Sequence, residues 1–187
     1  MYAPHDFSHL LGTSGFSDTL LTNHFTLYEG YVKNTNTLIE SLKKTEPGTP
    51  EYAELHRRFG WEWNGMRLHE LYFGNMKKGG AILEDGALKS AIEKEYGSIE
   101  LWRKDFSAIG AMRGIGWVVL VKDTAQDKLL NIWVNEHDLG HLAGTTPILI
   151  MDVFEHAFMI DYGLKRADYI EAFFNAIDWK EAEKRLR

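Results

Sequence analysis

The sequence contains no cysteine. This absence excludes a disulfide framework, a thiolate metal site and a cysteine nucleophile, and it fits a reducing compartment. Long hydrophobic runs are missing as well, since a stretch such as "IGWVVLV" falls far short of the roughly 20 residues that cross a bilayer. The first residues show no basic segment followed by an apolar one, so we expect no signal peptide. We therefore predict a cytoplasmic protein.

Positive charge is scarce. Lys and Arg number 21 against 27 Asp and Glu, which gives a formal net charge of −6. Proteins that bind nucleic acid usually carry a basic face, and electrostatic attachment to an anionic membrane also needs cations. We therefore expect neither nucleic acid nor a membrane as a partner.

Several familiar catalytic motifs are absent. The sequence has no G-x-S-x-G, no P-loop and no G-x-G-x-x-G, so serine hydrolysis and nucleotide use are unsupported. It also lacks Glu-x-x-His, the helical pattern of ferritin-like di-iron sites. What it does have is 187 residues, of which 44% are hydrophobic and 13% aromatic. This is enough for one compact unit, or two small lobes, with a sizeable core.

The N-terminal half predicts a helical hairpin. Ser17 can cap a helix over about 19–44, and "EPGTP" breaks it. A second helix over about 51–78, which can bend at Gly60, ends at "KKGG". Two long helices joined by a short break form an antiparallel pair, and we assign them to a first domain, 1–80.

The C-terminal half has a different pattern, with amphipathic stretches and short apolar runs. The two runs "GWVVLVKD" and "KLLNIWVN" are joined by "TAQD" and predict a β-hairpin. This mixture predicts a second, α+β domain over 81–187. Its expected elements are helices at 87–97 and 98–113, strands at 116–123, 128–135 and 146–152, and helices at 166–178 and 179–187.

Eight histidines are the main chemical resource. Iron and manganese sites combine imidazole nitrogen with carboxylate oxygen, and three local groups could supply them. Asp152 and His156 are four residues apart and would point the same way in a helix. His137 and His141 have the same spacing in "HDLGH", and His69 lies on the second long helix.

Each group also has a purely structural explanation. Asp152 could cap the element that follows it. The glycine in "HDLGH" favours a loop, in which a four-residue spacing has no fixed geometry. An isolated helical histidine such as His24 or His69 is commonly a hydrogen-bonded residue of the core or its rim.

Four stretches carry a family resemblance: "NGMRLHELYFGNM", "YGSIELWRKDF", "GIGWVVLV" and "DVFEHAF". They resemble motifs of the iron/manganese superoxide dismutase family, and they occur in the family's order. The last is the most specific, because it is similar to the signature D-V-W-E-H-A-(F/Y), which carries the final two metal ligands. The resemblance implies an α+β fold, with an N-terminal antiparallel helical hairpin followed by an α/β lobe that contains a three-stranded antiparallel sheet.

The resemblance implies one metal ion between the two lobes, held by three histidines and one aspartate. Carried over by motif, these ligands are His69, Asp152 and His156, with His24 as the remaining histidine. In the family an active-site tyrosine follows the first ligand by eight residues, whereas Tyr31 follows His24 by seven. Seven residues turn an α-helix by about 700°, which leaves the two side chains about 20° apart. We therefore expect both on one helix face.

The resemblance also assigns residues around the metal. The family places a glutamine near the metal-bound solvent from one of two positions, which here hold Gly65 and His137. His137 is therefore expected to hydrogen-bond that solvent. Trp117 matches a tryptophan that walls the pocket, and Arg166 matches an arginine near the substrate entrance. Tyr31 is expected to relay protons and gate access.

A dimer is implied as well. Glu155 matches a glutamate that crosses the interface, so we expect it to meet the partner's His156 in a homodimer. Two departures fall in the same stretch: Phe154 replaces the tryptophan of the signature, and Met159 replaces a tyrosine that bonds across the family's interface.

The implied activity is superoxide dismutation, which converts two superoxide anions and two protons to dioxygen and hydrogen peroxide by redox cycling of one mononuclear iron or manganese ion. Histidine at position 137 resembles iron-using or metal-tolerant members and favours iron over manganese. The alternative is a catalytically silent, metal-binding paralogue of the same fold. Superoxide decay measured with iron-loaded and manganese-loaded protein separates the two.

Overall fold

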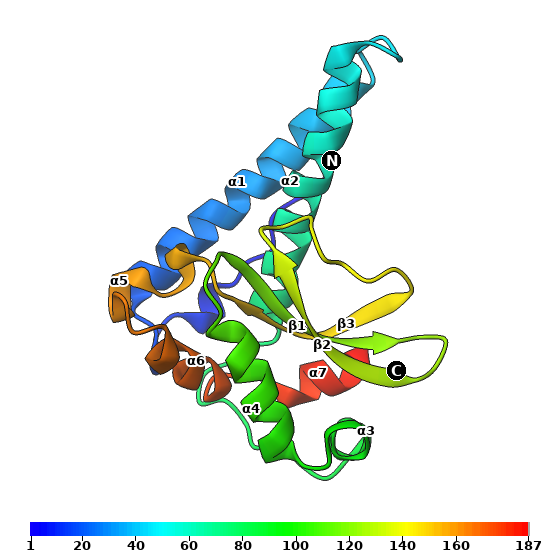
Figure 1. Cartoon of the computed structure of the whole chain (residues 1–187). Helices are drawn as coiled ribbons and strands as arrows, with labels where there is room; N and C mark the ends of the chain where they lie inside the picture. Colours follow the sequence, from blue (N-terminus) through cyan, green and yellow to red (C-terminus); the bar gives the residue numbers. More distant parts are fainter. Residues whose placement is uncertain (187) are drawn as a thin grey trace.

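Two long helices open the computed structural model, which describes residues 1–186. Figure 1 shows α1 and α2 side by side, with their connecting turn projecting away from the rest of the molecule. The Ser17 side chain caps α1 by accepting a hydrogen bond from the N–H of Leu20, and Thr49 caps α2 through the N–H of Tyr52. The predicted hairpin is confirmed. The helices are α1 (Asp18–Leu42) and α2 (Pro50–Gly74).

The second helix ends four residues earlier than predicted. It runs through Gly60 as one α-helix and stops at Gly74. The side chain of the next residue, Asn75, hydrogen-bonds the backbone of strand β3. The Asn75 side chain is fully buried. Its Nδ2 donates to the carbonyl of Ile150 at 3.2 Å and its Oδ1 accepts from the N–H of Ile150 at 2.9 Å. This pairing fixes the end of α2 against the C-terminal lobe.

The C-terminal lobe contains the three-stranded antiparallel sheet, in the order β2-β1-β3. Trp117 on β1 lies opposite Asp152, the last residue of β3. The predicted bounds of the first two strands are confirmed, and the third strand begins one residue earlier than predicted. The elements are α3 (Ala87–Tyr96), α4 (Ile99–Gly110), β1 (Gly116–Asp123), β2 (Lys128–Asn135), β3 (Thr145–Asp152), α5 (Met159–Tyr162), α6 (Arg166–Phe174) and α7 (Trp179–Arg185), with short 3₁₀ turns η1 (Ser8–Leu10) and η2 (Glu155–Ala157).

The last helices are shorter than predicted. α6 ends at Phe174 instead of continuing to 178, because Ile177 pairs as an isolated β-bridge with Met76. The carbonyl of Ala176 also accepts from the N–H of Lys77 at 2.8 Å. The last residue of the helix predicted over 179–187 lies outside the described residues.

The sheet is covered on both faces. α2 and α7 contact β3, while α4 contacts β1. Residues 116–121 of β1 are consequently all buried, which explains the continuous hydrophobic run "GWVVLV". None of the helices within residues 1–186 is both long and apolar enough to span a bilayer.

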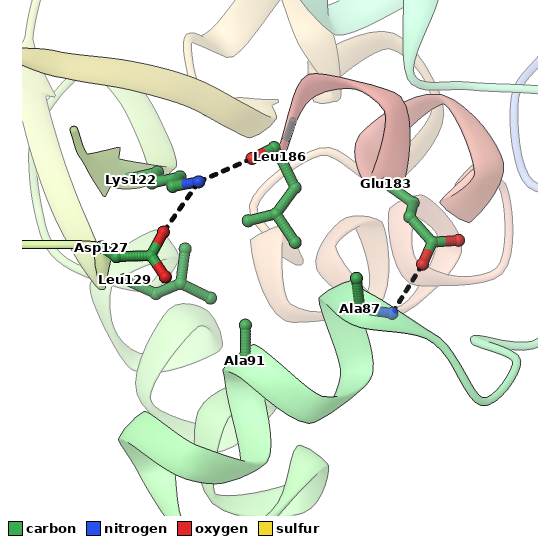
Figure 2. Close-up of a pocket in the computed structure, with 7 residues that line it drawn as sticks. All are labelled: Ala87, Ala91, Lys122, Asp127, Leu129, Glu183 and Leu186. Atoms are coloured by element: carbon green, nitrogen blue, oxygen red, sulfur yellow. Dashed lines mark hydrogen bonds and ion pairs between the residues drawn. The ribbon is translucent and has the colours of Figure 1, made fainter.

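A pocket of about 300 Å³ lies among α3, the β1–β2 end of the sheet and α7 (Figure 2). The Nζ of Lys122 in its lining donates to the carbonyl of Leu186 at 2.9 Å and pairs with Asp127 at 2.8 Å. Both contacts of this amine are therefore with residues close to the pocket. This pocket contains none of the predicted site residues.

Candidate metal centre

Four of the predicted side chains meet between the hairpin and the lobe. They come from α1 (His24), α2 (His69), the end of β3 (Asp152) and η2 (His156), and one potential ligand atom from each lies within 4.8 Å of the other three. The Oδ2 of Asp152 lies 3.2, 3.7 and 3.1 Å from the Nε2 atoms of His24, His69 and His156. His156 keeps 27% of its side chain exposed, while the other three are fully buried.

Two hydrogen bonds hold Asp152 in place, one at its carboxylate and one at its backbone carbonyl. Its Oδ1 accepts from the N–H of Phe154 at 2.8 Å, and the Tyr169 hydroxyl donates to the Asp152 carbonyl at 2.5 Å. Asp152 ends a strand and His156 lies in a 3₁₀ turn. The two residues are therefore not on a common helix, the case in which their four-residue spacing would have pointed them the same way. The end of the strand and the following turn bring them together instead.

The proton of His69 leaves a lone pair directed at this cluster. Nδ1 of His69 lies 2.5 Å from the carbonyl of Gly65, so it carries the proton and Nε2 is unprotonated. That Nε2 is buried and has no hydrogen-bond partner among residues 1–186. A buried acceptor without a partner is costly, and a metal ion would satisfy it.

The spacing also fits one ion. Ligand atoms about 2.1 Å from a common ion lie at most about 4.2 Å apart. The observed limit of 4.8 Å therefore needs only a contraction of a few tenths of an ångström per ligand. Three imidazoles and a carboxylate form a nitrogen and oxygen donor set that suits iron or manganese.

The charge states favour metal binding at neutral pH. Burial opposes ionisation of Asp152, but interactions with His156 and His24 outweigh it and hold the pKa of this carboxyl below its usual range. Burial lowers the pKa of His24 and of His69. The site therefore offers an anionic carboxylate and the neutral imidazoles of His24 and His69, which are the forms that bind metal.

A hydrogen-bonded chain runs beside the cluster through Trp117, His137 and Tyr31. The indole Nε1–H of Trp117 donates to Nδ1 of His137 at 3.1 Å, and an indole can only donate. The proton of neutral His137 therefore sits on Nε2 and is donated to the hydroxyl oxygen of Tyr31 at 2.7 Å. Burial lowers the pKa of His137 to about 4 and raises the pKa of Tyr31 to about 12, so both groups are neutral at pH 7.

His24 and Tyr31 do face the same way along α1. The His24 ring meets the His69 ring edge-on at 5.0 Å between centroids, and the Tyr31 ring stacks on His69 at 5.2 Å. Gly65 lies under Tyr31, because a Cβ added there would fall 2.5 Å from the tyrosine ring. Any side chain at position 65 is therefore excluded by Tyr31.

Some neighbours of the cluster escaped prediction. Phe154 was noted only as a departure from the signature, yet its ring stacks on His137 at 4.7 Å and on His156 at 5.1 Å. Trp61 meets His137 edge-on at 4.9 Å. Neither contact has a local sequence signal, although Trp61 lies two helical turns before His69 on the same helix.

The remaining predicted residues lie around this centre. The Glu155 side chain is exposed and makes no hydrogen bond to residues 1–186, while its backbone carbonyl accepts from the N–H of Phe158 at 3.2 Å. The Arg166 guanidinium donates to the carbonyls of Met112 and Gly114 at 2.7 and 2.9 Å. His141 lies in the predicted loop, with Nε2 at 2.9 Å from the carbonyl of His137.

The fold and the site define a protein that binds a single metal ion, with three imidazoles and one carboxylate at the boundary between a helical hairpin and an α+β lobe. Residues 84–185 match the model of the C-terminal domain of iron/manganese superoxide dismutases. The chain is also similar to an iron superoxide dismutase of Cupriavidus metallidurans, with 38% identity over 180 residues that cover 92% of this chain and 89% of the relative.

Manganese relatives are similarly close. A manganese superoxide dismutase of Haloferax volcanii is 38% identical over 174 residues, which cover 90% of this chain and 86% of the relative. The chain therefore belongs to the iron/manganese superoxide dismutase family and is an oxidoreductase that dismutes superoxide. The predicted family, fold and activity are confirmed.

Proposed function

We propose that His24, His69, Asp152 and His156 hold one iron ion per chain, with manganese as the alternative. The observation that carries this proposal is the buried, partnerless Nε2 of His69, which faces the Asp152 carboxylate across 3.7 Å. When bound, the ion supplies one-electron redox chemistry between its trivalent and divalent states, which oxidises one superoxide and reduces the next.

The protein's own part is to orient the ligands and to supply protons. Asp152 contributes the one negative charge among the four ligands. The N–H of Phe154 orients its carboxylate, and the Tyr169 hydroxyl holds its backbone carbonyl. Such outer contacts tune the ligands of a metal. Because His137 donates to the Tyr31 oxygen, the hydroxyl proton of Tyr31 is free to point toward a reacting anion. We propose that Tyr31 passes a proton to superoxide when superoxide is reduced.

Iron is proposed over manganese because a histidine, His137, occupies the position next to the ligands that a glutamine fills in much of the family. The printed names of the relatives include both metals. The test is the metal content of native protein, followed by superoxide decay with each metal at full occupancy. We expect iron in the native protein and higher activity with iron. Native protein that contains manganese alone would refute this preference.

A homodimer joined through Glu155 is the second part of the proposal. Glu155 is exposed, and the adjacent His156 is still partly open. The apolar side chains of Met159, Ile160 and Leu164, which follow in sequence, are exposed as well. Covering this segment with a second copy would close the site and let Glu155 reach the partner's His156.

The remaining assignments are also proposals. Trp117 walls the site and orients His137, and Arg166 acts near the entrance while it holds the segment before β1. The division into domains 1–80 and 81–187 is supported by the change from long helices to mixed structure after α2. A cytoplasmic location is supported by the cysteine-free composition and can be tested by cell fractionation.

A further inference from the structure

A pocket of about 290 Å³ opens between α1 and α2 beside the metal centre. Tyr31 belongs to its lining, and the Tyr31 ring stacks on the ligand His69. The pocket is therefore one side chain away from the metal ligands. Its lining consists of Leu27, Gly30, Tyr31 and Asn34 from α1, and of Arg58, Trp61 and Glu62 from α2.

Arg58 is the one cationic side chain in this lining, all of which lies within the described residues. Its Nε donates to Oε1 of Glu62 at 2.8 Å, and its Nη2 approaches the same oxygen at 2.6 Å. Nη1 makes no hydrogen bond to any of residues 1–186. The Arg58 side chain is 56% exposed, whereas that of Glu62 is 3% exposed. The ion pair therefore presents its positive end outward and keeps its carboxylate inside.

Two further contacts hold this arrangement in place. Nδ2 of Asn34 donates to Oε2 of Glu62 at 3.2 Å, so both carboxylate oxygens have partners. The Arg58 guanidinium lies over the Trp61 ring, 5.2 Å from its centroid, and Trp61 in turn contacts His137. The cation thus has a fixed position relative to the Tyr31–His137 pair, which a freely moving surface arginine would lack.

We infer that Arg58 draws superoxide into the metal site on the Tyr31 side, with Trp61 and Glu62 as the residues that position its guanidinium. The inference rests on the proposed function, in which the anion reacts beside Tyr31. A chain with a net charge of −6 repels an anion on average, so attraction must come from a local cation. The Arg166 guanidinium is committed to two backbone carbonyls, which leaves Arg58 as the cation with a free donor at this opening.

The test compares Arg58→Gln with Arg57→Gln. Both variants remove one positive charge, and Arg57 is the adjacent residue, 70% exposed and paired with Glu54. At low ionic strength we expect R58Q to lower kcat/KM for superoxide about threefold, the effect of one unit charge at about 6 Å in water. R57Q should lower kcat/KM less than about 1.3-fold. The R58Q defect should vanish near 0.5 M salt, where the Debye length is about 4 Å.

A second pair of variants covers the case in which R58Q leaves buried Glu62 unpaired and unfolds the protein. Glu62→Gln removes that charge, so the double variant R58Q/E62Q has no unpaired carboxylate. We expect E62Q to raise kcat/KM about twofold at low salt and the double variant to fall about threefold below E62Q. Azide serves as an anionic probe, and its equilibrium Kd is measured by calorimetry on metal-loaded protein. Binding should weaken by a similar factor in R58Q but not in R57Q.

The outcomes distinguish this inference from the proposed function. Wild-type protein without dismutase activity at full metal occupancy contradicts the proposed function. An active enzyme in which R58Q and R57Q show the same salt dependence, or in which R58Q leaves the azide Kd unchanged, overturns the role of Arg58.

Discussion

The indole N–H of Trp117 determines where the proton of His137 sits, and through it the freedom of the Tyr31 hydroxyl. Trp117→Phe removes this donor and leaves Nδ1 of buried His137 without a partner. We expect a loss of about 1–3 kcal/mol in the free energy of unfolding and about a tenfold loss of activity. Ring ¹⁵N NMR of His137 in metal-free protein should show mixed tautomers.

The matched control is Trp102→Phe. Trp102 is also buried and donates its indole N–H, here to Asn131 at 3.0 Å, far along the chain from the metal ligands. The Trp102→Phe variant should lose about as much stability as Trp117→Phe but keep full activity. Wild-type activity and an unchanged His137 tautomer in W117F would show that Trp117 does not orient His137.

Individual residues were predictable to different degrees. His69, Asp152 and His156 lie in recognisable motifs. The family resemblance assigned His24 as the remaining histidine, and the helix face that it shares with Tyr31 supported the assignment. The role of Trp61 could not be predicted, because its contact with His137 joins α2 to the loop after β2. No local pattern encodes such a long-range contact.

Among the elements, α2 supplies the ligand His69, and its Gly65 leaves room for the Tyr31 ring that stacks on His69. Gly65→Ala would place a Cβ 2.5 Å from Tyr31, whose hydroxyl is held by His137. We expect the strain of overpacking to cost about 1–3 kcal/mol and to displace Tyr31, which lowers activity. Urea unfolding and superoxide decay measure the two effects.

Gly60→Ala is the control on the same helix. A Cβ at Gly60 meets nothing within 4 Å, so the higher helix propensity of alanine should stabilise the protein by about 0.5–1 kcal/mol with activity unchanged. If G65A is stabilised to the same extent as G60A, Tyr31 does not pack as closely against Gly65 as in this structure.

The strands were predicted closely because β1 and β2 are short β-branched and apolar runs separated by a polar turn. The ends of α2 and α6 were not predicted, because both helices stop where the next residues bond to partners far along the chain. Asn75 pairs with Ile150, and Ile177 bridges to Met76. Local helix propensity continues through both ends and carries no information about these partners.

At the scale of the whole molecule, the proposed homodimer would cover the partly open His156. Glu155→Gln keeps the shape of the side chain but removes its charge, so the proposed bond to the partner's His156 should weaken. We expect the dimer dissociation constant from sedimentation equilibrium to rise at least about tenfold. Glu95→Gln, at an exposed position on α3, should leave it unchanged. A wild-type chain that stays monomeric at micromolar concentration would exclude the dimer.

The most direct test of the metal centre is the metal-to-chain ratio of wild-type protein and of His24→Ala after identical loading. His24 is the ligand that the family resemblance assigned without a motif of its own, and its Nε2 lies 3.2 Å from the Asp152 carboxylate. We predict about one ion per chain for the wild type and, for a folded His24→Ala variant, a metal affinity lower by about 10-fold or more. A folded His24→Ala variant that retains one ion per chain with undiminished affinity would contradict the four-residue site.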